Sequence, residues 1–206
     1  ELDGCDEELS TLVDEVRGVL KKHGAFEISV ATEESERLRL WQGRKAAFPA
    51  VGRLAPDYYC MDGTIPRREL ASMLNRISEM SAEYNLQVAN VFHAGDGNLH
   101  PLILYDANDD DQVRRAEKFG SDILLLCIEK GGTITGEHGV GVEKINEMCV
   151  QFSDKELALF HRIKKAFDEK GILNPGKGIP TLSRCAEFGA MHVHVGDEKF
   201  GDLERY

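Results

Sequence analysis

The sequence has little positive charge, no long apolar run and no closely spaced cysteines. Lysine and arginine total 25 against 36 aspartates and glutamates, so the formal net charge is −11. An acidic surface repels phosphate backbones, which argues against a nucleic-acid partner. No apolar stretch approaches the roughly 20 residues that a transmembrane helix needs.

Cysteine usage limits the protein class further. The five cysteines are scattered and form no CxxC pair, which argues against a disulfide framework, a zinc ribbon and a resident iron–sulfur cluster. Free thiols and the lack of a signal peptide are typical of a cytoplasmic protein. The start at Glu-Leu-Asp-Gly rather than Met suggests an excised piece, although a processed chain or a disordered N-terminus would look the same.

Hydrophobic periodicity predicts helices alternating with strands. We expect helices over residues 6–22, 33–48, 66–80, 109–129 and 154–170, and strands over residues 26–31, 57–65, 86–92 and 99–105. Pro49 is expected to end the second helix. This order indicates an α+β fold, in which helices pack on an antiparallel or mixed sheet.

The strongest chemical pattern is a Gly-rich turn between two predicted strands, in the segment from His93 to His100 (HAGDGNLH). Its turn formers tolerate positive φ and place the two histidines at the shoulders of one hairpin. Across a hairpin both imidazoles can face one point, as two metal ligands do. Two alternatives stay open: the histidines bracket a surface turn by chance, and Asp96 is either a third ligand or only a turn residue.

A second pattern, GGTITGEHGVG from Gly131 to Gly141, surrounds the pair Glu137-His138 with glycines. Such a tight backbone is typical of a ligand site, and a flexible linker between two helices is the alternative. Adjacent residues of an extended segment point in opposite directions, so Glu137 could ligate a metal while His138 faces a substrate. Two imidazoles and one carboxylate suit zinc, iron(II) or manganese, and this set does not separate hydrolysis from oxidation.

Three further patterns are weaker. Arg44 shares a helix face with Trp41, and a guanidinium beside an aromatic ring can clamp a carboxylate, although a solvated surface arginine is the commoner case. Residues 171–178 (GILNPGKG) indicate a helix stop followed by a turn. His192 and His194 have a spacing that metal ligands can use, but we expect them in an exposed tail.

Together, the segments HAGDGNLH, GGTITGEHGVG and ILNPGKG resemble the C-terminal domain family of FAD-linked oxidases. These vanillyl-alcohol-oxidase-like flavoproteins include D-lactate dehydrogenases and D-2-hydroxyglutarate dehydrogenase. Residues 41–66 are most similar to the FAD-linked D-type subunits of bacterial glycolate oxidases. The resemblance implies a ferredoxin-like cap over residues 1–108, truncated at its N-terminus, and a C-terminal helical segment over residues 109–206 that completes the flavin and substrate site. We expect the family's N-terminal FAD-binding domain to be absent from this chain.

The resemblance implies a role for each residue of the first two motifs. His93, His100 and Glu137 match the family's divalent-metal ligands, and His138 matches the residue proposed as general base. The implied reaction oxidises the α-hydroxyl of a small 2-hydroxy acid, glycolate or D-lactate, to a 2-oxo acid. The implied cofactors are a divalent metal such as Zn, Mn or Fe, and FAD, which the complete protein would hold.

Other matched residues concern the substrate and the flavin. Arg44 matches an arginine that grips the substrate carboxylate, and Asn174 and Lys177 match the segment beside the flavin ring. Relatives that act on dicarboxylic substrates place an extra basic residue near the position of Cys60. The residues at and beside Cys60 supply no such base, which favours a small substrate.

The resemblance also implies partners. These are the FAD domain of the same complete chain and the iron–sulfur and second flavin-type subunits of a glycolate oxidase complex, since no cluster motif here could carry electrons away. Attachment to the inner face of the membrane through those subunits is the alternative to a free cytoplasmic location. Two other functions stay open: a metal-dependent hydrolase, and a non-catalytic binding or assembly module. We expect the isolated chain to be colourless and inactive, with uncovered apolar surface that permits self-association.

Overall fold

The computed structural model describes residues 2–181, and the chain divides into two compact units, residues 1–47 and 48–206. The first unit contains α1 (Asp6–Lys22) and α2 (Glu34–Lys45), neither of which has a buried residue. α1 begins where the sequence predicts, and the Cys5 amide donates to the Glu8 carboxylate at its N-terminus (2.9 Å).

Two predictions within residues 26–49 are wrong. Residues 26–31 form no strand, and the side chain of Phe26 is fully exposed. A strand is stable only when another strand pairs with it, and none in the described part of this unit does so. Pro49 does not end α2, which already ends at Lys45; it lies in α3 (Ala47–Val51), where an N–H in the first turn needs no helical partner.

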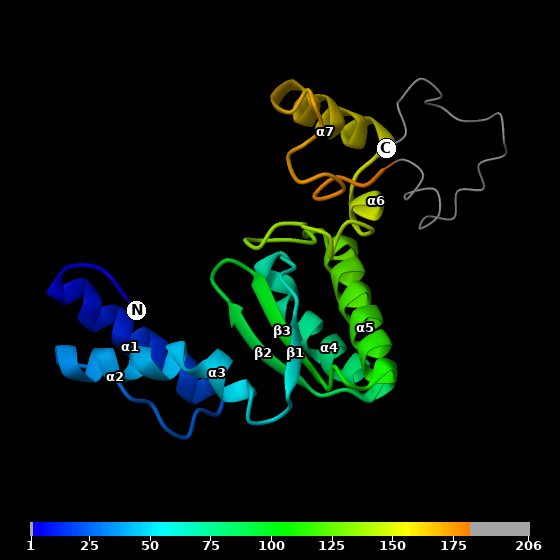
Figure 1. The fold of residues 1–206 in the computed structure, drawn as a ribbon. Helices are drawn as coiled ribbons and strands as arrows, with labels where there is room; N and C mark the ends of the chain where they lie inside the picture. Colours follow the sequence, from blue (N-terminus) through cyan, green and yellow to red (C-terminus); the bar gives the residue numbers. More distant parts are fainter. Residues whose placement is uncertain (1, 182–206) are drawn as a thin grey trace. The chain divides into compact units, whose positions relative to one another are not determined.

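The second unit is built on an antiparallel sheet of three strands (Figure 1). The strands are β1 (Asp57–Cys60), β2 (Val88–His93) and β3 (Asn98–Tyr105), in the order β1-β3-β2. The chain crosses from β1 to β2 through η1 (Arg67–Glu69) and α4 (Leu70–Tyr84), and β3 returns between them. This is the split β-α-β arrangement of ferredoxin-like folds, and the α+β prediction is confirmed.

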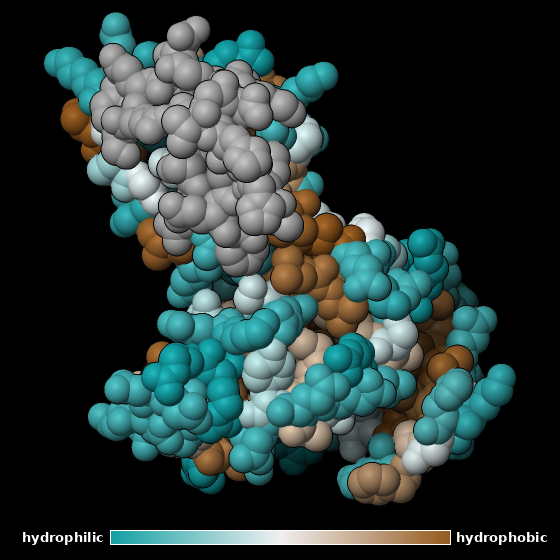
Figure 2. Space-filling view, turned by 90° about the vertical axis from the view of Figure 1, so that its right-hand side faces the viewer, coloured by the Kyte–Doolittle hydropathy of each residue, from teal (hydrophilic) through white to brown (hydrophobic). Residues whose placement is uncertain are grey.

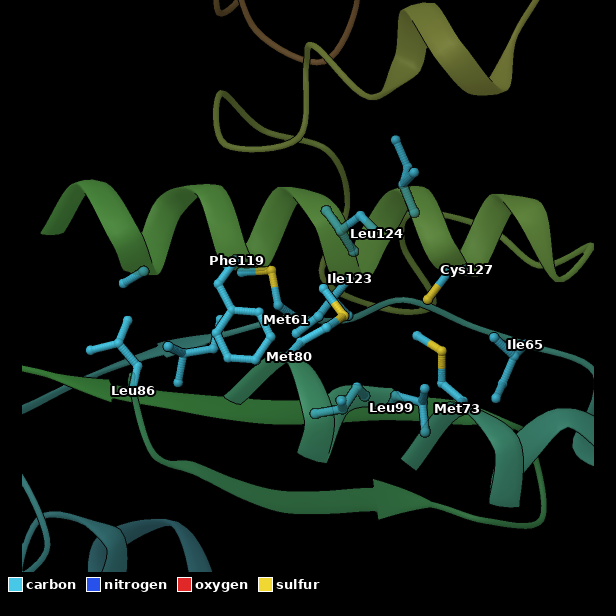
Figure 3. Packing of buried hydrophobic residues seen from close by; sticks show 14 of the residues in the cluster. Met61, Ile65, Met73, Met80, Leu86, Leu99, Phe119, Ile123, Leu124 and Cys127 are labelled. Carbon is cyan, nitrogen blue, oxygen red and sulfur yellow. The ribbon is translucent and has the colours of Figure 1, made fainter. Parts of the chain in front are cut away.

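The main core lies between the sheet and two helices, α4 and α5 (Asp110–Glu129), which cover one face (Figure 1). Phe119 and Ile123 of α5 face Met73 and Met80 of α4 across this layer (Figure 3). Burial of each such side chain stabilises the fold by about 1.5–3 kcal/mol. This layer therefore fixes the sheet that carries the hairpin from His93 to His100.

The opposite face of the sheet carries a smaller apolar cluster. Leu102 and Leu104 of β3 pack there with Val51 of α3 and with the partly buried Phe48. Because side chains alternate along a strand, His100 lies on this same face. Its ring centroid is 6.3 Å from that of Phe48. The fold thus places His100 beside α3 rather than beneath α4 and α5.

After α5 the chain passes through the Gly-rich loop into α6 (Met148–Gln151), which the sequence pattern did not predict, and α7 (Asp154–Phe167). α7 begins after Ser153, whose backbone amide and hydroxyl both donate to the Glu156 carboxylate in the first turn of the helix. The C-terminal segment is therefore helical in its described part. His192 and His194 lie outside the described residues.

Two sequence inferences concern the protein class. None of the helices within residues 2–181 is both long and apolar enough to cross a membrane. Within residues 2–181, the thiols of Cys5, Cys60 and Cys127 are free, as the scattered cysteine pattern predicts.

Candidate active site

Glu137 lies at the centre of three imidazole rings. Its Oε1 is 2.8 Å from Nε2 of His100, 3.8 Å from Nε2 of His93 and 3.9 Å from Nε2 of His138. The rings of His100 and His138 stack at a centroid distance of 5.1 Å, and the ring of His93 stands edge-on to His100 at 5.5 Å. The hairpin and the Gly-rich loop, about forty positions apart in the sequence, therefore meet at one point.

The hairpin fixes the two histidines that it carries. The register pairs His93 with Asn98, so His93 and His100 are diagonal neighbours on one face of the sheet. Gly97 has φ +71°, and a Cβ at this position would overlap the Ile65 carbonyl oxygen, so glycine is required in the turn. Asp96 is exposed in the same turn. Within the described residues, neither Asp96 nor His93 belongs to a group of side chains whose ligand atoms all lie within 4.8 Å of one another, although Nε2 of His93 is 3.8 Å from Oε1 of Glu137.

Both ring nitrogens of His100 face an oxygen atom. Its Nδ1 lies 3.2 Å from the Met61 carbonyl oxygen, which can only accept, so this nitrogen carries the proton. Nε2 then presents a lone pair to the Glu137 carboxylate, and two such groups repel unless a proton or a cation lies between them. Metal-ligating histidines commonly use their second nitrogen in this way. The donor arrangement therefore fits a divalent metal.

Two overlapping sets of side chains are close enough to ligate one ion, with ligand atoms within 4.8 Å of one another. The first set, with nitrogen and oxygen donors, contains Asp62, His100, Glu137 and His138. The second set, with nitrogen donors and a thiol, contains Cys60, His100 and His138. Nitrogen and oxygen donors suit zinc, manganese and iron(II). The expectation that Glu137 and His138 point apart is wrong, because the loop bends here and is not extended.

A fully buried aspartate, Asp62, holds the backbone of the Gly-rich loop. Its carboxylate accepts hydrogen bonds from the amides of Gly136 (3.1 Å), Glu137 (3.2 Å) and His138 (2.9 Å). The Asp62 carbonyl oxygen also accepts from the Gly136 amide at 2.8 Å. Three successive peptide groups are thus anchored at one residue, directly at the pair Glu137-His138.

Lys144 is the buried counter-ion of Asp62, with Nζ 3.1 Å from Oδ2. Burial alone would raise the pKa of Asp62. Hydrogen bonds from the Thr135 hydroxyl, the His138 amide and Lys144 outweigh that effect and hold the pKa well below the usual range for an aspartate. Asp62 is therefore ionised at neutral pH.

Neither Asp62 nor Lys144 was predicted as a site residue from the sequence. Asp62 falls within the strand predicted over residues 57–65, where aspartate is a poor strand former. An acid between the apolar residues Met61 and Ile65 was the available signal, because a buried carboxylate needs partners that the local sequence does not supply. Nothing local marks Lys144 as the partner, since the two residues are 82 positions apart.

The segment Met61–Ile65 joins the hairpin to the loop. β1 ends at Cys60, and the chain continues without regular pairing. Thr64 exchanges two backbone hydrogen bonds with Thr133 of the loop, at 2.9 and 3.1 Å. On its other side the Ile65 amide donates to the Gly97 carbonyl at 2.9 Å. The relative position of the two motifs is therefore fixed by a third segment that lies between them.

The remaining predicted site residues lie elsewhere in the chain. Asn174, with φ +47°, and Lys177 are exposed on the turn after α7. The amide of Gly178 donates to the Gly141 carbonyl at 2.8 Å, which attaches this turn to the end of the Gly-rich loop. Arg44 lies in the last turn of α2, in the first unit, and its contact with substrate stays a prediction.

Comparison with known proteins decides the family. Residues 1–178 match the family described as FAD linked oxidases, C-terminal domain. The chain belongs to this family. It is 59% identical over 206 residues to glycolate oxidase subunit GlcD of Escherichia coli K12, covering 100% of the chain and 41% of that protein. It is 37% identical over 177 residues to glycolate oxidase subunit GlcD of Bacillus subtilis, covering 86% of the chain and 38% of that protein.

A mitochondrial D-lactate dehydrogenase [cytochrome] of Arabidopsis thaliana is 34% identical over 167 residues, covering 80% of the chain and 30% of that protein. The chain therefore spans less than half the length of these family members. Among solved structures, 4-ethylphenol oxidase from Gulosibacter chungangensis shares the fold, with a TM-score of 0.51 and 20% identity. That likeness covers 66% of this chain and 27% of the oxidase.

Proposed function

We propose that this chain is the substrate-side part of an FAD-dependent 2-hydroxy-acid dehydrogenase or oxidase. The reaction converts the α-hydroxyl of glycolate or D-lactate to a 2-oxo acid. The observation that carries the proposal is the convergence of His93, His100 and His138 on Oε1 of Glu137. Family membership and relatives named as a glycolate oxidase subunit and a D-lactate dehydrogenase favour oxidation over the hydrolysis that the same donors could serve.

His93, His100 and Glu137 would hold a divalent metal such as zinc, manganese or iron. Such an ion supplies Lewis-acid chemistry, lowering the pKa of a bound hydroxyl. The contacts of His100 support this role. Its Nδ1 is hydrogen-bonded to the Met61 carbonyl, and its Nε2, which is left for a metal, faces Glu137.

Asn174 and Lys177 would lie beside FAD in the complete protein, where this cofactor supplies the two-electron chemistry. Apolar side chains flank their turn in exposed positions, with Phe167 85%, Ile172 71% and Leu173 54% exposed. Exposed apolar residues of this kind fit a surface that another domain covers. Figure 2 shows hydrophobic patches interrupting a mostly hydrophilic surface.

Two residues of the chain would act on the substrate itself. Arg44 binds the carboxylate, for which a guanidinium offers two parallel donors. His138 accepts the hydroxyl proton at a ring nitrogen; histidine is the side chain most often used for this step. The His138 side chain is 49% exposed, so a small ligand can reach it, and the stacked ring of His100 limits its rotation.

The side chain at position 60 favours a substrate with one carboxylate. The Cys60 thiol lies within 4.8 Å of ligand atoms of His100 and His138. Burial, with the charge of Asp62 as a further cause, raises the pKa of this thiol to about 11, so it is neutral at physiological pH. A neutral group here cannot pair with a second carboxylate. Glycolate and lactate carry only one carboxylate and need no such partner.

The complete protein would pass its electrons to iron–sulfur and second flavin-type subunits of a glycolate oxidase complex. Support comes from the relatives that are named as subunits of such an oxidase and from the lack of cluster-type cysteine spacing in the sequence. The location would be the cytoplasm or the inner face of the membrane. Alone, the 206-residue chain would be an inactive module that self-associates through its uncovered apolar surface.

The proposal is tested by the rate of flavin reduction in the complete protein, followed by stopped-flow absorbance after mixing with glycolate or D-lactate. His138→Ala is expected to slow reduction by about 10² to 10⁴-fold, the usual worth of a general base. His23→Ala, at the exposed C-terminus of α1, is the matched control, and the flavin of this variant should be reduced at the wild-type rate. A near-normal rate in His138→Ala would overturn the assignment of the base.

A further inference from the structure

One buried carboxylate controls the direction of two site residues. The Asp62 carboxylate accepts hydrogen bonds from the backbone amides of Gly136, Glu137 and His138. It therefore fixes the peptide planes on both sides of Glu137. Those planes set where the Glu137 and His138 side chains leave the backbone. We propose that Asp62, with Lys144 as its counter-ion, is the positioning residue that sets the metal affinity of the site. This inference rests on the proposed metal role of His100 and Glu137.

The contacts of Asp62 go beyond those of an ion pair with Lys144. A buried ion pair is often replaceable by apolar residues without loss of stability. Here an apolar residue at position 62 would leave the amides of Glu137 and His138 without an acceptor, because within residues 2–181 they donate to Asp62 and to no other group. The carboxylate therefore has a task that a well-packed apolar side chain does not perform.

Lys144 closes the loop onto the same point. Its backbone amide donates to the Val140 carbonyl at 3.2 Å, and its ammonium reaches Asp62 at 3.1 Å. At its other end the loop is paired with Thr64, two residues after Asp62. Both ends of the loop are thus attached to the segment that contains Asp62, and Glu137 is held between these attachments. Residues that orient metal ligands in this way typically change metal affinity by about 10–100-fold when replaced.

Three variants of the complete protein separate positioning from stability: Asp62→Asn, Lys144→Met and the double variant. Asp62→Asn keeps the shape but turns an NH₂ group toward N–H donors, and each single change leaves one buried charge unpaired. The double variant removes both charges. We expect its thermal unfolding midpoint to recover relative to both single variants, while its loop amides still lack the carboxylate.

Cobalt(II) alone is the probe, titrated into the metal-free protein and followed by its visible absorption. We expect affinity to fall about 10–100-fold in Asp62→Asn and to stay low in the double variant. Amide hydrogen exchange gives a second readout without metal, and the peptide that contains residues 136–138 should exchange faster in both variants. Asp168→Asn is the matched control, because Asp168 accepts the amides of Ile172 and Leu173 and pairs with a lysine away from the site. It should leave cobalt affinity unchanged.

The outcomes distinguish this inference from the proposed function. If His100→Ala loses cobalt while the double variant binds within about twofold of wild type, the positioning role is refuted and the metal role stands. If wild type and His100→Ala bind cobalt equally, the metal role fails, and the positioning role fails with it. Weak cobalt binding in the double variant despite a recovered unfolding midpoint, together with faster amide exchange at residues 136–138 in the metal-free protein, supports the inference. Weak binding with wild-type exchange would instead make Asp62 a ligand of the ion and overturn the positioning role.

Discussion

Nε2 of His100 lies 2.8 Å from Oε1 of Glu137 while Nδ1 of the same ring reaches the Met61 carbonyl at 3.2 Å. A turn of the ring would break the hydrogen bond to Met61, and the buried position of His100 leaves no water to replace it. The ring is therefore set in one orientation before any ligand arrives. Preorganisation of this kind is what a metal centre requires of its ligands.

The first prediction concerns Glu137→Gln. The amide keeps the size of the side chain but loses the charge that a divalent ion needs, so bound metal should fall well below one ion per chain. The check is metal content by mass spectrometry after gel filtration of the complete protein. Glu143→Gln is the control, since Glu143 is exposed just beyond the loop. Full metal content in Glu137→Gln would show that this carboxylate is not a ligand.

The second prediction concerns Arg44→Lys. Lysine keeps the charge but loses the two parallel donors, and a hydrogen bond to a charged group contributes about 1.5–3 kcal/mol. We therefore expect kcat/KM for glycolate to fall by about 10–150-fold in the complete protein. Arg39→Lys, on the same helix, should behave like wild type. If both variants keep the wild-type kcat/KM, another residue holds the substrate carboxylate.

The sequence predicted the parts of the fold that depend on local chemistry. The turn formers between His93 and His100 specify a hairpin without help from the rest of the chain, and β2 and β3 lie within two residues of their predicted bounds. α1, α5 and α7 likewise begin within one residue of their predicted starts, since helical apolar spacing is equally local. These features follow from neighbours in the sequence, so a single sequence is enough to find them.

The features that were predicted wrongly or missed depend on contacts between distant residues. The alternating residues 26–31 resemble a strand, but a strand forms only where a partner exists, and the pattern contains no information about partners. The role of Asp62 likewise depends on Lys144, 82 positions away. The direction of His138 depends on the amides that Asp62 holds, so the expectation that it diverges from Glu137 was wrong.

The third prediction compares two glycines of one turn. Gly97→Ala introduces a Cβ at positive φ that would overlap the Ile65 carbonyl, so we expect a loss of about 2–4 kcal/mol in the free energy of unfolding. Gly95 has open space around its Cβ position, and Gly95→Ala should stay within about 0.5 kcal/mol of wild type. Urea unfolding monitored by circular dichroism measures both, and equal losses would contradict the geometry of the turn.

The last prediction uses a second close approach, between Gly63 and Cys127. A Cβ at Gly63 would lie 2.5 Å from the buried Cys127 sulfur, so Gly63→Ala should destabilise the protein by about 1–3 kcal/mol. Cys127→Ala removes that sulfur and opens the space. The loss of unfolding free energy in the double variant should therefore be smaller than the sum of the two single losses by about 0.5–2 kcal/mol.

The same double variant tests whether packing at Gly63 reaches the site. Gly63 stands between Asp62, which holds the Glu137 amide, and Thr64, which pairs with the loop. A backbone shift at position 63 would therefore displace Glu137, and cobalt affinity should fall in Gly63→Ala and return when Cys127→Ala is added. Strict additivity in unfolding, or cobalt affinity that does not follow stability, would show that α5 and the site are not connected through this segment.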